Sequence, residues 1–502
     1  MNILVDNNIV LDYYNTKRRE EFKESIEALE LIFSSDRYEA YISVSSLDNL
    51  EFVKATELKR AFGYANKKIL NNIIKDILSL FKIAKTPSYI EMDYEDIEDS
   101  QIIASAKAIG AKVLTRDKGM LKKYFNIAIT PKDFLENIDN NKNIDFANLK
   151  KQYFLYQPEL GREMDRVLNN SSYIMGSAVE RLERNLEEFT GAKHAITCSS
   201  GTDALLLAMM ALDIGRGDEV ITTPFTFIAT AETIAFLGAK PVFVDIDEKT
   251  YNIDPSKIED KISSKTKAIM PVSLYGQPSN MDEIQAIATK HNLKVIIDGA
   301  QSFGSTFNGV SDSNLGDIST TSFFPAKPLG CFGDGGAVFT NDETLVSKIK
   351  SLRVHGQSKR YHHKHIGMGG RMDALQCAIV DVKLKYYSKD LTLRQEVALK
   401  YSQKLKDKEL ILPFIDSKAT SAFAQYSIRV KNRDSLQVKL KELGIPTAVH
   451  YPMPLHLQEC FEYLDYKDGD FPISEKISKE ILSLPMNPYV SSNEIDYIST
   501  NI

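Results

Sequence analysis

Lys327 is the side chain in this sequence with the clearest potential for covalent chemistry. It follows a β-type run, 317–324, and precedes a glycine-rich loop, 330–336. An amine beside a buried strand loses solvent, and desolvation lowers its pKa, as a Schiff-base lysine requires. Taken alone, Lys327 fits a solvated surface lysine better, because lysines are seldom buried.

Asp298 ends a second apolar run, 294–298, and Gln301 follows three residues later. A carboxylate at the end of a buried strand is costly unless it meets a positive partner, such as the N–H of a pyridinium ring. A helix cap or a turn acid explains the same residue equally well.

Gly201 and Thr202 open an apolar helix directly after the strand predicted at 192–198. The free N–H groups and the positive dipole end of such a helix suit a phosphate, although a plain helix cap has the same pattern. Phe227 follows the strand predicted at 219–222 and can lie against a planar cofactor or in the core.

These residues occur in the order phosphate seat, stacking aromatic, ring-nitrogen acid and Schiff-base lysine. Together they predict a pyridoxal phosphate site on an α/β fold whose strands alternate with helices. The C-terminal part, from 386 on, opens with a charged helix at 386–406 and mixes strand and helix.

Acidic residues also follow strands or open helices in the N-terminal part. Asp6 follows the apolar run 2–5, Asp48 lies on the helix after the strand 39–44, Asp99 opens a helix, and Asp117 follows the strand 112–115. Carboxylates that converge on one pocket repel each other unless a cation neutralises them. A set of helix caps and exposed acids is the alternative.

Length, charge and composition bound these interpretations. The length of 502 residues predicts two or three domains. The net charge of −6 gives no bulk electrostatic attraction for nucleic acid, and the four scattered cysteines are expected to be reduced thiols. We expect no signal peptide and no membrane span, and therefore a cytoplasmic protein. An asparagine-rich linker at 137–143 separates a domain at 1–136 from the rest, which we divide into a large domain, 144–385, and a small one, 386–502.

The N-terminal part resembles a PIN domain, a three-layer α/β nuclease fold, on the motif from Val5 to Val10, on Asp48 and on the segment from Asp99 to Asp117. The resemblance implies that Asp6, Asp48, Asp99 and Asp117 hold Mg²⁺ or Mn²⁺ and that RNA is the substrate. Position 48 is a departure, because the family usually has glutamate there.

Residues 144–502 resemble the DegT-type sugar aminotransferases. The motifs are GTDAL from Gly201, FTFIAT from Phe225, DGAQ from Asp298, SFFPAK from Ser322 and GDGG from Gly333. The resemblance implies a fold type I enzyme, with a large α/β domain, a mostly parallel sheet and a small α+β subdomain. It also implies a catalytic role for Lys327 and Asp298, and cofactor contacts from Gly201, Thr202, Phe227, Gln301 and Ser322.

Within that family, the motifs around Pro271, Pro325, His355 and Ala448 resemble aminotransferases that act on UDP-linked 3-keto-2-acetamido-glucuronic acid. This implies glutamate as amino donor, a homodimer with shared active sites, and Arg371 and His450 as cations for the substrate. Gly369 is a departure, since an asparagine usually stands there.

Three alternatives stay open from the sequence. In the first, the aminotransferase acts on a 4-keto nucleotide sugar. In the second, the N-terminal half is a metal-dependent ribonuclease and is the working part of the protein. In the third, the N-terminal half is an inert interaction module.

Overall fold

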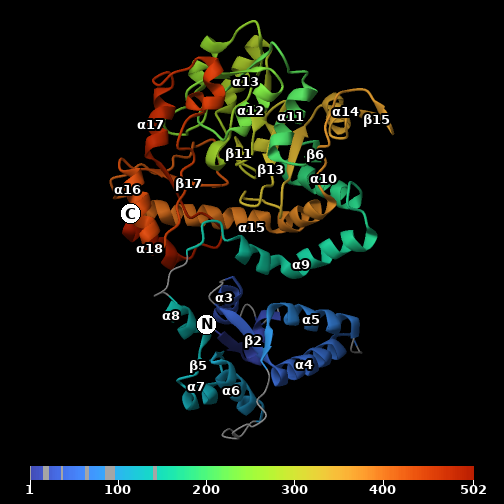
Figure 1. The fold of residues 1–502 in the computed structure, drawn as a ribbon, viewed down its shortest axis with the longest axis vertical. Coiled ribbons are helices and arrows are strands. Elements are labelled where there is room, and N and C mark those ends of the chain that lie inside the picture. The colour runs from blue at the N-terminus through green and yellow to red at the C-terminus, as the bar shows by residue number, and fades with distance from the viewer. Residues whose placement is uncertain are drawn as a thin grey trace. The chain divides into compact units, whose positions relative to one another are not determined.

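The chain forms two compact units. The computed structural model describes residues 2–14, 18, 22–34, 38–62, 67–84, 97–138 and 144–502. The first unit comprises Met1–Lys142 with Lys150–Pro158, and the second comprises Asn143–Leu149 with Glu159–Ile502 (Figure 1). Most of the predicted linker at 137–143 lies outside the described residues, and the predicted division at 385 stays a prediction.

A five-stranded parallel sheet forms the centre of the first unit, in the order β3-β2-β1-β4-β5. The strands are β1 (Asn2–Val5), β2 (Glu39–Ser43), β3 (Lys82–Ala84), β4 (Lys112–Leu114) and β5 (Ala128–Ile129). The helices are α1 (Asn7–Tyr14), α3 (Lys23–Ser34), α4 (Val44–Phe62), α5 (Lys67–Leu80), α6 (Ile97–Ile109), α7 (Lys118–Lys123) and α8 (Pro131–Ile138).

Alternate residues of β1 enter two different cores. Ile3 and Val5 pack with residues of α1, α3 and α8, whereas Leu4 packs with residues of α6 and α7. Successive side chains of a strand point to opposite faces, so the sheet is covered by helices on both sides. This gives three layers, as the sequence predicts, while the PIN identity itself stays a prediction.

The second unit is built on a seven-stranded sheet in the order β6-β14-β13-β10-β9-β7-β8. Only β14 (Gly336–Thr340) runs antiparallel to its neighbours there, β6 (His194–Cys198) and β13 (Ile318–Ser322). The remaining strands are parallel: β7 (Glu219–Thr222), β8 (Lys240–Phe243), β9 (Thr266–Ile269) and β10 (Lys294–Asp298). The mostly parallel sheet predicted for this part is therefore present.

Helices pack on both sides of this sheet and form separate cores with it. They are α10 (Ser177–Thr190), α11 (Gly201–Ala211), α12 (Ala229–Phe236), α13 (Met281–His291) and α14 (Glu343–Leu352), with the 3-10 turns η1 (Pro255–Lys257), η2 (Glu259–Lys261), η3 (Leu274–Gly276) and η4 (Asp312–Asn314). The helix α9 (Leu149–Asn170) contributes Val167 to one of these cores, whereas its residues Lys150–Pro158 belong to the first unit. Two further antiparallel pairs are β11 (Thr306–Phe307) with β12 (Val310–Ser311) and β15 (Gln357–Lys359) with β16 (His362–His363).

The long helix α15 (Ala374–Leu405) links the sheet to the C-terminal part (Figure 1). Its first half packs into the core that contains Phe303 and Phe323, and its second half packs on β17 (Tyr426–Arg429) and β18 (Ile481–Leu484). The C-terminal part also holds α16 (Arg433–Glu442), α17 (Pro472–Glu480), α18 (Ser492–Asn501), η5 (Leu455–Leu457) and η6 (Glu459–Leu464). The sequence prediction of a helix start at 386 was wrong.

Within the described ranges, no helix combines the length and the apolar content that a membrane crossing requires.

Candidate functional site

The carboxyl ends of neighbouring strands bring the predicted site residues of the second unit together. Asp298 is the last residue of β10 and pairs in register with Thr320 of β13. Ser322 ends β13 and pairs with Gly336, which in turn pairs with Cys198, just before α11. The predicted phosphate seat and the predicted ring-nitrogen acid therefore lie on one edge of the sheet, where ligands of α/β folds bind.

Asp298 is 5% exposed, and its carboxylate accepts hydrogen bonds from two donors. Thr230 Oγ1 donates to its Oδ2 at 2.7 Å, and the backbone N–H of Ala300 donates to its Oδ1 at 3.2 Å. Burial raises the pKa of Asp298, while these two donors and the charge of Lys327 act in the opposite direction. A carboxylate in this setting gains most from a cationic or N–H partner.

Lys327 lies after β13 in a tight loop, where its backbone N–H donates to Phe324 O at 2.8 Å. Burial lowers the pKa of its amine, and the nearby Asp298 carboxylate opposes this shift. In the part of the chain that the structure describes, no hydrogen bond or ion pair engages Lys327 Nζ. The amine is thus free for a covalent partner and its pKa favours the nucleophilic form.

Gly201 and Ser322 form a cradle at the N-terminus of α11. A Cβ on Gly201 would lie 2.7 Å from Ser322 Cβ and 3.1 Å from Ser322 Oγ. Ser200 caps the helix by accepting from the Asp203 N–H at 3.0 Å, so the first amides, at Gly201 and Thr202, have no partner within the helix. This arrangement suits a phosphate group.

Two rings and an amide form a cluster close to Asp298, whose charge acts on the Tyr451 hydroxyl. Phe227 is 54% exposed, and its ring centroid lies 6.2 Å from that of Tyr451. Gln301 donates through Nε2 to the Tyr451 hydroxyl at 3.0 Å and accepts from the Tyr275 N–H at 2.8 Å. Tyr451 is therefore part of the site; the sequence prediction missed it as a site residue, although its motif was noted.

His450 is partly buried, and its Nδ1 lies 2.9 Å from Ser483 Oγ. Burial, followed by the charge of Lys327, lowers the pKa of His450 to about 4. At neutral pH its imidazole is uncharged, so the prediction that His450 supplies a cation is corrected to a neutral imidazole. Of the two residues predicted to supply a cation for the substrate, Arg371 and His450, only Arg371 remains.

Arg371 follows a segment that borders the cradle, since the Ser199 N–H donates to Gly370 O at 3.0 Å. The neighbouring Gly369 has a steric reason to be small. A Cβ there would lie 3.2 Å from Cε1 of His355, so a larger residue requires the His355 ring to move.

The N-terminal unit brings two of its four predicted metal ligands near each other. Asp6 is 5% exposed and accepts from Thr115 Oγ1 at 2.7 Å. Burial raises its pKa, and the charge of Asp117 contributes to the same shift. Asp117 itself caps α7 by accepting from the Met120 N–H at 2.6 Å.

The other two predicted ligands, Asp48 and Asp99, do not join a metal site in the described residues. Asp48 is exposed. Glu98, which the sequence prediction missed, accepts from Nδ2 of Asn7 and from Nδ2 of Asn49, the latter at 2.7 Å. Among the residues described, no group of three or more His, Cys, Asp or Glu side chains could hold a metal ion. The predicted Mg²⁺ or Mn²⁺ thus gains no support.

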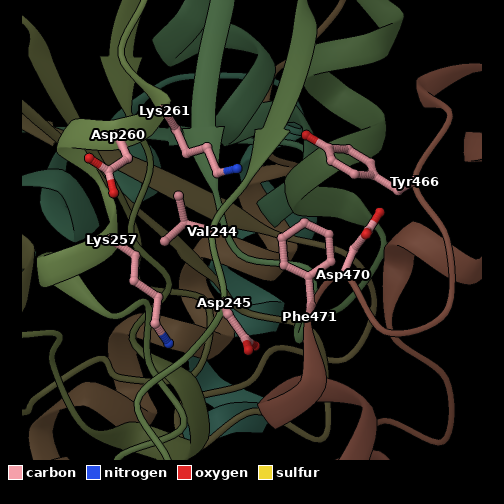
Figure 2. A pocket seen from close by; sticks show the side chains of 8 residues that line it. All are labelled: Val244, Asp245, Lys257, Asp260, Lys261, Tyr466, Asp470 and Phe471. Atoms are coloured by element: carbon pink, nitrogen blue, oxygen red, sulfur yellow. The ribbon is translucent and has the colours of Figure 1, made fainter.

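A cavity of about 400 Å³ lies elsewhere in the second unit, after the carboxyl end of β8. Figure 2 shows the Lys261 amine and the Tyr466 hydroxyl pointing into this space. Asp245 lies at its edge but is occupied, because it accepts from the N–H groups of Ile473 and Ser474 at 3.0 Å each. None of the residues predicted from the sequence lines this cavity; those that do are Val244, Asp245, Lys257, Asp260, Lys261, Tyr466, Asp470 and Phe471.

Comparison with known proteins decides the family of the second unit. The profile of the DegT/DnrJ/EryC1/StrS aminotransferase family matches residues 156–502. The chain belongs to this family. One relative, the UDP-2-acetamido-2-deoxy-3-oxo-D-glucuronate aminotransferase of Pseudomonas aeruginosa, is 48% identical over 355 residues, which are 71% of this chain and 98% of the relative.

Solved structures agree with this assignment. A DegT/DnrJ/EryC1/StrS aminotransferase from Brucella abortus superimposes with a TM-score of 0.69 at 38% identity, covering 71% of this chain and 98% of that one. NtdA from Bacillus subtilis, solved with its cofactor PMP, gives a TM-score of 0.67 at 28% identity and covers 80% of this chain and 96% of its own. The aminotransferase unit is a PLP-dependent sugar aminotransferase.

Proposed function

We propose that the aminotransferase unit transfers an amino group from glutamate to the 3-keto group of UDP-linked 2-acetamido-3-keto-glucuronic acid, in the cytoplasm. The product is a precursor for surface polysaccharide. The similarity to the Pseudomonas aeruginosa enzyme, over 98% of its length, supports this substrate class. The observation that carries the proposal is the position of an unengaged Lys327 amine near the buried carboxylate of Asp298.

The residues present fit pyridoxal phosphate. The Gly201–Ser322 cradle, which a Cβ would fill, suits the phosphate; Lys327 Nζ would hold the aldehyde; and Asp298 would face the ring nitrogen. Phe227 would lie against the ring, and Gln301 with Tyr451 would border its hydroxyl side. When bound, the cofactor supplies an electron sink for the substrate carbon that loses or gains a proton.

The chain's own residues supply the proton transfers. When it is not bonded to the cofactor, Lys327 Nζ would take the proton from the substrate carbon that loses one and deliver it to the carbon that gains one. Burial lowers the pKa of this amine and so favours its neutral form, which a general base requires. A positive partner at the ring nitrogen would favour the ionised form of Asp298, and the Thr230 hydroxyl donates to its Oδ2.

The substrate carboxylate requires a positive charge that the site keeps at neutral pH. Arg371 provides it, since the pKa of His450 near 4 leaves that imidazole neutral, able only to donate or accept a hydrogen bond. Around the site, Phe227, Phe324 and Phe332 are 54%, 51% and 40% exposed. These exposed rings support a homodimer in which a second copy covers the site.

A visible absorption spectrum of the purified protein tests this function. We expect a band from the cofactor joined to Lys327, its loss on adding glutamate, and its return with the 3-keto substrate. Lys327→Ala should abolish the band and the turnover, whereas Lys389→Ala, on the exposed side of α15, should change neither. A band that returns only with a 4-keto nucleotide sugar would replace the proposed substrate.

The N-terminal unit has a second candidate function, metal-dependent cleavage of RNA. The feature that favours it is the position of Asp6 and Thr115, which follow the neighbouring strands β1 and β4 at the point where the strand order reverses. Cleavage of single-stranded RNA with Mg²⁺ or Mn²⁺ that Asp6→Asn abolishes would support it. If the protein does not cleave RNA, and if removal of residues 1–143 leaves transamination unchanged, the N-terminal unit would instead be an interaction module.

A further inference from the structure

Two buried side chains on α15 hold the two loops that carry the proposed catalytic residues. We call residues 298–304 the Asp298 loop and residues 323–331 the Lys327 loop. Lys383 Nζ donates to Gly330 O at 2.7 Å, in the Lys327 loop. The Tyr387 hydroxyl donates to Phe303 O at 2.6 Å, in the Asp298 loop. Because the two donors are four residues apart, they lie on one face of the helix, one turn from each other.

The Lys327 loop is a closed turn that Lys383 holds at its end. The Cys331 N–H donates to Phe323 O at 2.8 Å, which joins the two ends of the loop. Gly330 packs so tightly that a Cβ would lie 2.5 Å from Pro325 O. A rigid turn transmits the position of its Gly330 carbonyl to Lys327, three residues away.

Lys383 is 3% exposed, and its charge is not neutralised by an ion pair in the described residues. Its amine lies 4.5 Å from the centroid of the Phe332 ring, a cation–π contact next to the same loop. Burial lowers the pKa of Lys383 to about 8. A buried lysine is costly to keep, and here its contacts are directed at the backbone that carries Lys327.

The Asp298 loop is fitted to α15 with equal tightness. A Cβ on Gly304 would lie 2.9 Å from Cε1 of Tyr387, and Tyr387 itself is 1% exposed. Phe303 also contacts the other loop, since its ring centroid lies 6.0 Å from that of Phe323. The two loops and one helix face therefore form a single packed assembly.

We propose that Lys383 and Tyr387 are positioning residues that set the distance between the Lys327 amine and the Asp298 carboxylate. The proposal rests on the proposed roles of Lys327 and Asp298. Neither side chain touches the reacting atoms; each acts through a backbone carbonyl. The same helix turn fixes both loops, so loss of either bond displaces one catalytic group relative to the other.

The test uses the full-length protein loaded with pyridoxal phosphate. Lys383→Met removes the donor at nearly constant length, and Tyr387→Phe removes one hydroxyl. We expect each variant to lower kcat about tenfold or more with little change in KM for the sugar, because misplacement weakens the reacting geometry and spares remote binding. Each should also weaken cofactor affinity and shift the pH at which the visible band of the bound cofactor titrates.

Lys383→Gln, which keeps a donor, should restore part of each loss, and Lys389→Met on the exposed side of α15 should match the wild type. Tyr387→Phe is a mild change, so it keeps the test open if Lys383→Met does not fold. Variants with wild-type cofactor affinity, band titration and kcat would overturn the inference. So would a loss of thermal stability with these three readouts unchanged. If instead the wild type forms no visible band with pyridoxal phosphate, the proposed function itself fails.

Discussion

Gly201 and Ser322 approach each other so closely that a Cβ on Gly201 would lie 2.7 Å from Ser322 Cβ. We predict that Gly201→Ala lowers affinity for pyridoxal phosphate at least about tenfold, because the added methyl group displaces Ser322 and narrows the space in front of the first amides of α11. Equilibrium titration of the apoprotein, followed by absorbance or fluorescence, measures this affinity.

Gly161 offers the matched control. It lies within α9, and no atom lies within 4 Å of a Cβ built there. Gly161→Ala should leave cofactor affinity unchanged and stabilise the helix by up to about 1 kcal/mol. Equal losses of affinity in both variants would contradict the cradle.

Thr230 sets the electrostatics of Asp298. Its hydroxyl donates to Asp298 Oδ2 at 2.7 Å and lies 3.0 Å from the hydroxyl of Thr226. Because this hydrogen bond lowers the pKa of Asp298, Thr230→Val should raise that pKa and weaken the ionised carboxylate that the ring nitrogen needs. We expect kcat to fall roughly tenfold, as for loss of a hydrogen bond to a charged group.

Thr226→Val is the control for this prediction, since it removes the outer hydroxyl and keeps the bond between Thr230 and Asp298. Steady-state kinetics over a range of pH should show a smaller loss of kcat in Thr226→Val than in Thr230→Val. The acid side of the plot of kcat against pH should not shift in Thr226→Val. A larger loss in Thr226→Val would assign the effect to packing.

Residue types and strand ends made much of the site predictable. The observed bounds of β7 and β10 match the predicted strands 219–222 and 294–298, because β-branched runs there end at polar residues. Asp298 and Ser322 end strands, so the parallel sheet alone brings them to one edge. Their order along the chain carried the cofactor prediction.

Contacts between distant segments could not be predicted in this way. Gln301 meets Tyr451 across 150 residues, and no local pattern indicates that pair. The start of α15 was placed at 386 because the sequence becomes strongly charged there. The earlier turns, from Ala374 on, are buried on most sides and lack an amphipathic pattern. The neutral state of His450 likewise depends on burial, which only the fold determines.

Asp312 predicts a pH dependence of stability. It is 1% exposed, its carboxylate accepts from Ser302, and burial raises its pKa from 3.8 to about 6. Between these two values the folded protein binds the proton more strongly than the unfolded chain does. The contribution of Asp312 to the free energy of unfolding therefore falls as pH rises through this window, by up to roughly 3 kcal/mol.

Asp312→Asn removes this titration and keeps an acceptor for Ser302. Urea unfolding at several pH values should show that the difference between wild type and variant changes across the window from 3.8 to about 6 and is constant above it. A difference that is constant throughout would mean that Asp312 titrates normally.

We predict that the two compact units unfold as separate cooperative blocks, and Asp12 in the first unit offers a way to test this. It is completely buried in α1 and accepts from Arg18 at 2.8 Å and from Arg116 at 3.0 Å. Arg116 also lies 3.7 Å from the centroid of the Phe22 ring. Asp12→Asn removes the charge that both arginines share, and we expect a loss of roughly 2 kcal/mol, because both arginines are partly exposed and regain water. The loss should lower the denaturation midpoint of the first unit only, since the chain divides into two compact units.

Two probes separate the blocks in that experiment. Far-UV circular dichroism follows both units, and the visible band of the bound cofactor follows the second alone. Asp12→Asn should shift an early circular-dichroism transition and leave the loss of the visible band where it is in the wild type. Glu24→Gln changes an exposed acid of α3 and is the control, which should shift neither probe. A parallel shift of both probes in Asp12→Asn would show instead that the first unit stabilises the aminotransferase unit, and would give the fusion a structural purpose.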